Sequence, residues 1–187
     1  MRRLIVYCFA LSFAIALSVV PTPAAQKSRA ADKSAAQSSP DYITREVRHE
    51  LIMLPEYGVF DNLAFRVDGT NVTLLGQVTK PILKSDAGNV VKRIEGVTKV
   101  DNQIAILPPS SMDDGIRMAE YRAIYSESSL LRYAMQAVPP IHIIVDTGKV
   151  TLEGVVATQS DKDLANLRAG TVGGVFSVTN NLRVEGK

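Results

Sequence analysis

The sequence contains few of the residues that build metal centres or thiol chemistry. Its 187 residues include one cysteine, Cys8, and two histidines, His49 and His142. Neither histidine has a Cys, Asp or Glu at the spacing of metal ligands, so we interpret both as surface or helix-face residues. Nucleotide-binding loops, nucleophile elbows and zinc signatures are missing as well. The sequence therefore predicts no catalytic residue, no cofactor-binding residue, no metal ligand and no enzyme activity.

An excess of basic charge, which nucleic-acid binding needs, is also missing. Arg2-Arg3, an apolar run from Leu4 to Val20 and small residues up to Ala25 predict a secretory signal peptide. Its cleavage would remove two of 21 basic residues, none of 19 acidic residues and the single cysteine. We therefore expect an exported chain of zero formal charge, without disulfide bonds and without a nucleic-acid partner. An uncleaved membrane anchor is the less favoured alternative, because the run is short for a bilayer span.

An internal repeat dominates the remaining sequence. The segment VDGTNVTLLGQV, residues 67–78, recurs as VDTGKVTLEGVV at residues 145–156, an offset of 78 residues. At the same offset, Gly96-Val97, Val100 and Asn102 match Gly174-Val175, Val178 and Asn180. The sequence therefore encodes one small module twice.

Each repeat begins with a predicted strand hairpin. Apolar and polar residues alternate with the period of a half-buried strand. Asp68-Gly69 and Thr147-Gly148 provide the positive φ of a tight turn. Gly76 and Gly154 fall in the middle of the second strand, where we expect a missing side chain to let a helix approach.

Helices are predicted on both sides of each hairpin. Ser39 caps a helix that Pro55 ends, and a second helix covers residues 81–94. In the second repeat a helix begins at Thr158, with Leu164, Leu167 and Val172 as its apolar stripe. One strand follows each of these helices, with a common inner phase: Val100, Ile104 and Ile106 in the first copy, Val178, Leu182 and Val184 in the second.

The predicted fold class is α+β, with two tandem αββαβ modules. Each module is expected to be a three-stranded mixed sheet with two helices on one face. The expected segments are a signal peptide (1–25), a flexible leader (26–39) and two domains (40–107 and 112–187). The lead into the second module is longer than its counterpart, with a helix from about Met112 to Tyr125 and a short helical piece from Leu130.

The hairpin segment and the later Gly-Val, Val and Asn positions resemble those of the BON domain. The double copy behind a signal peptide resembles the osmotically inducible envelope proteins of Gram-negative bacteria. This resemblance implies the αββαβ unit, a periplasmic setting, and a role in binding phospholipid membranes or envelope proteins. It offers no catalytic residue to transfer.

Two functional hypotheses follow. In the first, the protein binds membrane lipid or an envelope protein through apolar residues that lie where a solvated surface is expected, in the first loop and in the lead into the second module. The candidate contact residues are Tyr57, Val59, Phe60, Leu130, Leu131 and Met135. These residues could instead close the end of the core. In the second hypothesis the protein is a structural or oligomerising module, whose open sheet faces, with Leu75, Ala105 and Ile144, meet the other copy or a second chain.

Overall fold

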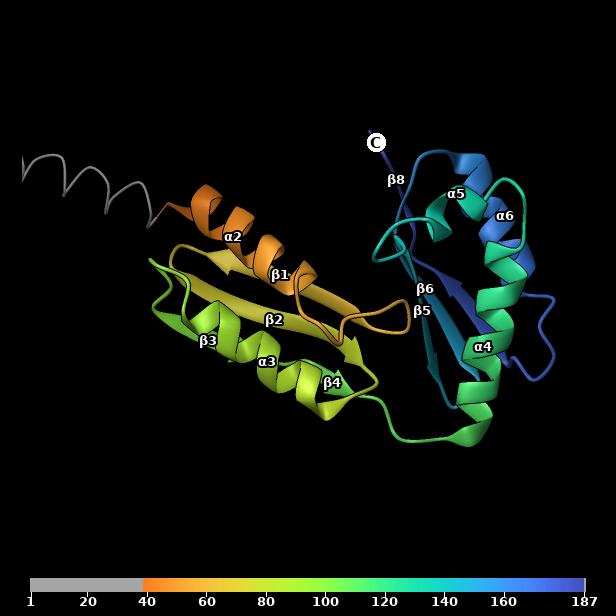
Figure 1. Ribbon diagram of the computed structural model, residues 1–187, viewed down its shortest axis with the longest axis horizontal. Coiled ribbons are helices and arrows are strands. Elements are labelled where there is room, and N and C mark those ends of the chain that lie inside the picture. Colours follow the sequence, from red (N-terminus) through yellow and green to blue (C-terminus); the bar gives the residue numbers. More distant parts are fainter. Residues whose placement is uncertain (1–38, 187) are drawn as a thin grey trace, which may run out of the picture.

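The computed structural model describes residues 39–186, which form two modules of helices packed on sheets (Figure 1). The expected signal peptide and residues 26–38 of the expected leader lie outside the described residues. The first module consists of α2 (Pro40–Ile52), β1 (Asn62–Asp68), β2 (Asn71–Val78), α3 (Pro81–Lys92), β3 (Lys99–Asn102) and β4 (Ala105–Ile106). The second consists of α4 (Ser111–Tyr125), α5 (Leu131–Ala134), β5 (Ile141–Asp146), β6 (Lys149–Val156), α6 (Gln159–Ala169), β7 (Ser177–Asn180) and β8 (Arg183–Val184).

The two sheets have the same topology and register. The central strand β2 pairs antiparallel with β1 and parallel with β3 and β4. Likewise, β6 pairs antiparallel with β5 and parallel with β7 and β8. Val67 faces Val72 in the first hairpin, and Val145 faces Val150 in the second, as the offset requires. The predicted α+β fold with two mixed sheets is confirmed.

Each module has its own apolar core. In the first, Ile43 and Val47 of α2 pack with Leu74 of β2 and Leu83 of α3. The second core gathers α4, α6 and the inner face of its sheet, and also includes Leu130 and Tyr133 from the lead. Burying a large aliphatic side chain stabilises by roughly 1.5–3 kcal/mol, so each core contributes to the stability of its own module.

The helix starts follow the sequence, and Leu164 of the predicted α6 stripe packs against the second core, but Leu167 of that stripe does not. Thr158 and Asp161 form the expected capping box at the start of α6. The buried face of α6 is Asp161, Ala165 and Ala169, whereas Leu167 is 63% exposed. The helix turns its small residues inward, where they leave room for α4 to pack against it.

The last strand of each module is interrupted rather than continuous. Asn102 Nδ2 donates to the Lys84 carbonyl (2.8 Å), and Asn102 Oδ1 accepts from Ile104 N (3.3 Å). Asn180 makes the same two bonds one repeat later, at 2.9 Å and 3.1 Å. The interruption places Ile104 in the core, while Ile106 is 46% exposed at the sheet margin. The prediction that Ile106 belongs to the inner phase is therefore wrong.

Glycine is required at the two mid-strand positions for a different reason from the one expected. Gly76 has φ +110° and Gly154 has φ +123°. A Cβ at Gly76 would lie 2.0 Å from the backbone oxygen of Asn62, and one at Gly154 would lie 1.9 Å from that of Pro140. The close approach comes from the backbone at the start of the neighbouring strand, and not from a helix.

Candidate binding site at the junction of the two modules

The two modules meet at the bridging loop, residues 53–61, which joins α2 to β1. Asp61 fixes its shape, because Oδ1 accepts from the backbone N (2.7 Å) and Oγ1 (2.9 Å) of Thr79. Asp61 Oδ2 also accepts from Gly58 N at 3.2 Å. A buried carboxylate with three donors holds the loop in one conformation and directs it towards β5 (Figure 1).

The tip of the bridging loop lies along the edge of β5. Ile143 N donates a hydrogen bond to the Val59 carbonyl at 2.8 Å. Val59 and Phe60 pack against the core of the second module, although they belong to the first. The ring of Phe60 meets Tyr121 of α4 edge-on, with 6.3 Å between centroids. The first module therefore completes part of the second core.

Tyr57 and His142 form a second contact at the junction. Their rings stack at 5.3 Å between centroids, and Tyr57 Oη and His142 Nε2 are joined by a 3.2 Å hydrogen bond. His142 is 8% exposed, so the prediction of a surface histidine is wrong for this residue. Burial lowers the pKa of His142, and burial raises the pKa of Tyr57 to about 12. Both side chains are therefore neutral at pH 7.

Three hydrogen bonds close the edge of β5 that does not pair with β6. Tyr125 Oη donates to the Ile141 carbonyl (2.6 Å), and Arg117 Nη2 donates to the Val145 carbonyl (2.7 Å). Between these two bonds lies the one from Ile143 N to Val59. An edge closed in this way offers no further strand a place to pair.

One charged side chain on α4 is buried without a partner. Glu120 is 0% exposed, and neither carboxylate oxygen has a hydrogen-bond partner among the described residues. Burial raises the pKa of Glu120 to about 8, so most of this carboxyl is protonated at neutral pH. Ile116, Glu120 and Ile124 occupy the place on α4 that Ile43, Val47 and Leu51 occupy on α2. The second module thus carries an ionisable group where the first has valine.

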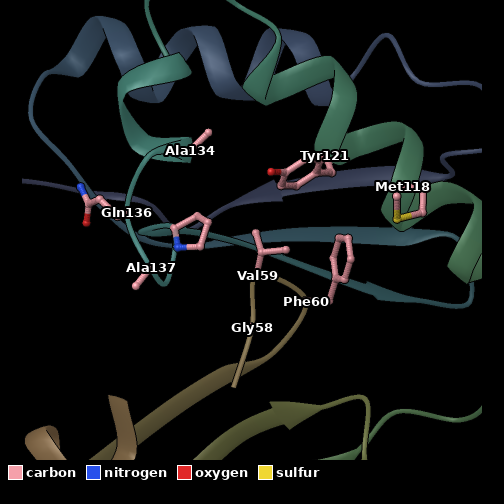
Figure 2. A pocket seen from close by; sticks show the side chains of 9 residues that line it. Gly58, Val59, Phe60, Met118, Tyr121, Ala134, Gln136 and Ala137 are labelled. Carbon is pink, nitrogen blue, oxygen red and sulfur yellow. The ribbon is translucent and has the colours of Figure 1, made fainter. Parts of the chain in front are cut away.

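An apolar cleft of about 430 Å³ opens beside the bridging loop (Figure 2). Its walls are Val59 and Phe60 on one side, Met118 and Tyr121 of α4 on another, and the segment after α5 on the third. In Figure 2 the side chains of Val59 and Phe60 point towards Tyr121 and Met118. Met118 is 44% exposed at the rim, so a bound apolar group could reach it.

The structure separates the six predicted contact residues into three environments. Tyr57, Val59 and Phe60 lie at the junction, where Val59 and Phe60 also line the cleft. Leu130 is fully buried in the second core and has no exposed surface to offer. Leu131 and Met135 are 51% and 84% exposed.

Sequence reasoning missed Met118 and Tyr121 as lining residues. Their spacing of three on a predicted helix places them on one face, but no sequence signal showed that a loop of the other module faces them.

Within residues 39–186, no group of three His, Cys, Asp or Glu side chains lies close enough to hold a metal ion. None of the helices in this range is both long and apolar enough to cross a membrane.

The fold and the junction define a class of protein, in which one αββαβ module occurs twice and the first copy packs a loop against the second. The BON domain family matches residues 41–108 and 127–186. The chain therefore belongs to the BON domain family.

Known proteins resemble this chain in sequence and in structure. The chain is similar to osmotically-inducible protein Y of Escherichia coli strain K12, with 32% identity over 127 residues, covering 66% of this chain and 62% of that protein. The C-terminal domain of CdsD, a structural protein of the type III secretion system of Chlamydia trachomatis, shares 13% identity over 75% of this chain and 96% of its own, with a TM-score of 0.27. A second CdsD structure has 12% identity, the same TM-score, and coverage of 75% and 90%.

Proposed function

We propose that this protein is an exported, non-enzymatic binding protein of the periplasm that associates with phospholipid membranes. Membership of the BON domain family and the similarity to an osmotically-inducible protein support a role in protecting the envelope under osmotic stress. The predicted signal peptide supports export. The contact surface is the apolar cleft with the exposed methionines beside it.

The observation that carries this proposal is apolar surface left open around the cleft. Met118 at the rim is 44% exposed, and Met135, between the lining residues Ala134 and Gln136, is 84% exposed. Leu131 on α5 is 51% exposed. Contiguous exposed apolar side chains mark interaction surfaces, and methionine adapts its shape to irregular partners such as acyl chains.

The free energy available from these side chains is enough for weak and reversible adsorption to a membrane. Transfer of a large apolar side chain out of water stabilises by roughly 1.5–3 kcal/mol, so two inserted methionines suffice for a measurable affinity. Because the chain after residue 25 carries equal numbers of acidic and basic residues, we expect little dependence on salt.

Vesicle sedimentation tests the proposal. Vesicles of phosphatidylethanolamine and phosphatidylglycerol should pellet the chain from residue 26 onward. The double variant Met118→Ser/Met135→Ser should lose this binding and keep its melting temperature, since both side chains are exposed. A matched control is Ile82→Ser/Met112→Ser, which removes two apolar side chains that are 53% and 61% exposed away from the cleft. Equal loss in both variants, or no binding by the parent chain, would contradict the proposal.

A further inference from the structure

The edge of β1 is the counterpart of the closed edge of β5. At the offset of 78, Leu63, Phe65 and Val67 match Ile141, Ile143 and Val145, and the strand registers agree. In the second module, backbone groups of these residues point outward and bond to Tyr125, Val59 and Arg117. The equivalent groups of the first module therefore point outward as well: the carbonyls of Leu63 and Val67 and the N–H of Phe65.

The first module lacks the two helix side chains that bond to the edge of β5. When the buried stripes of α2 and α4 are matched, Ile52 takes the place of Tyr125, and Thr44 takes the place of Arg117. Isoleucine has no hydrogen-bonding group, and threonine is much shorter than arginine. Across residues 39–186, a hydrogen bond from outside the sheet reaches only the first of these outward positions, where the backbone of Leu63 bonds to Tyr57; none reaches the backbone of Phe65 or Val67.

An open groove of about 1000 Å³ follows from this difference. It runs along β1 beneath α2, and the second module borders it with His142, Glu153 and Arg183. Leu63, Phe65 and Val67 line the groove and are only partly buried. A strand of seven residues with an unpaired edge and half-covered apolar side chains is a template for another strand.

We propose that β1 of a second copy of this chain fills the groove, pairing antiparallel with β1 about a two-fold axis at Phe65. In this register Phe65 faces Phe65 of the partner, and Leu63 faces Val67 of the partner. These are the positions whose backbone groups point outward, so the central Phe65 pair can exchange both hydrogen bonds, and each Leu63 carbonyl can accept from Val67 N–H of the partner. The apolar side chains then meet on one face of a continuous sheet that crosses the dimer.

The side chains on the other face of β1 are also compatible with this register. Ala64 faces Arg66 of the partner, and Asn62 faces Asp68 of the partner, so no two like charges stand directly opposite. A shift of the axis by one residue would oppose the two Arg66 side chains and turn the unbonded backbone groups away. Residues 26–38 of the chain itself are a poorer occupant, because they contain no large apolar residue for the groove.

Charge reversal across the pair tests the dimer. Sedimentation equilibrium of the chain from residue 26 onward should give a mass twice that of one chain. Ala64→Arg places a second cation opposite Arg66 of the partner and should halve this mass. The double variant Ala64→Arg/Arg66→Glu should restore it, because the opposed charges then attract. Ala105→Arg adds the same charge to an exposed residue on the opposite edge of the sheet and should leave the dimer intact.

A disulfide test identifies the register through the gain of a covalent product and does not depend on loss of the dimer. Ala64 and Arg66 of the partner form a non-hydrogen-bonded pair, whose Cα atoms are about 4.5 Å apart and within reach of a disulfide. The only native cysteine is Cys8. Mixing Ala64→Cys with Arg66→Cys under mild oxidation should give a covalent heterodimer, and mixing Ala105→Cys with Arg66→Cys should give none. A single-chain mass for the parent protein, or equal cross-linking in the two mixtures, would overturn the proposal.

Discussion

At the scale of single residues, Glu120 is the group whose chemistry differs most from its counterpart. Its pKa is raised to about 8 because burial disfavours the carboxylate, while an unfolded glutamate titrates near 4.5. The folded state therefore holds a proton that the unfolded state has lost between these two pH values. The stability that comes from the protonated carboxyl is fully present below about pH 4.5 and is lost as pH rises to 8.

We predict that Glu120→Gln removes this pH dependence. The amide has the shape of the protonated acid and carries no charge, so it should raise the unfolding free energy at pH 8 by roughly 1–3 kcal/mol. At pH 4 the two proteins should be nearly equal. Thermal melting across this range measures the difference. Parallel melting curves at every pH would show that the carboxylate has a solvent path or a partner.

At the scale of elements, the glycines of β2 and β6 have a positive φ at points where the backbone of the neighbouring strand approaches closely. Val at Gly76 would bring Cβ to 2.0 Å from the oxygen of Asn62 at a φ of +110°, which side chains rarely adopt. We predict that Gly76→Val and Gly154→Val each destabilise by on the order of 3 kcal/mol, through backbone strain and a displaced first strand.

A glycine in open space is the control for that prediction. Gly115 on α4 has nothing within 4 Å of an added Cβ, and Gly115→Ala should stabilise by about 0.5–1 kcal/mol through helix propensity. Chemical denaturation of the three variants measures all these effects. Unchanged midpoints for the two valine variants would mean that the strands repair the clash at no cost.

The same elements show how far the sequence predicts the structure. Local signals located the hairpins, the caps and the starts of the helices, because turn residues and the two periodicities act over a few residues. The strand interruptions at Asn102 and Asn180 were not predicted, since their cause is a bond to a helix carbonyl 18 residues away. In α6 the prediction was wrong for Leu167, because it favoured large apolar side chains and overlooked that Ala165 and Ala169 let the helix pack closely.

The candidate site was predicted less well than the fold. Apolar residues in the bridging loop were identified from their composition, but their contact with β5 depends on how the two modules are placed. Sequence patterns within one module carry no information on that placement. For this reason Val59 and Phe60 were expected at a membrane surface, whereas they also complete the core of the other module.

At the scale of the whole molecule, the junction joins two otherwise separate cores through few contacts. The hydrogen bond from Ile143 to Val59 and the ring pair of Tyr57 and His142 are the polar part of that joint. His142 is held neutral by burial, with Asp61 nearby in the loop and Glu153 opposite on β6. A protonated imidazole would have to be desolvated there, which opposes the closed arrangement of the modules.

The final prediction is that acid loosens this junction. The pKa of His142 is lowered from 6.5, so the stability that its neutral form provides is present above pH 6.5 and declines as pH falls below that value. Glu120 has the opposite pH dependence, so the measurement is made in the Glu120→Gln background.

Exchange of the Ile143 amide hydrogen, corrected for intrinsic rate, should accelerate from pH 7 to pH 5 while amides in β2 keep their protection. His142→Phe keeps a stacking ring without a titrating group, and in it the acceleration should disappear; an equal acceleration in that variant would assign the effect to another residue.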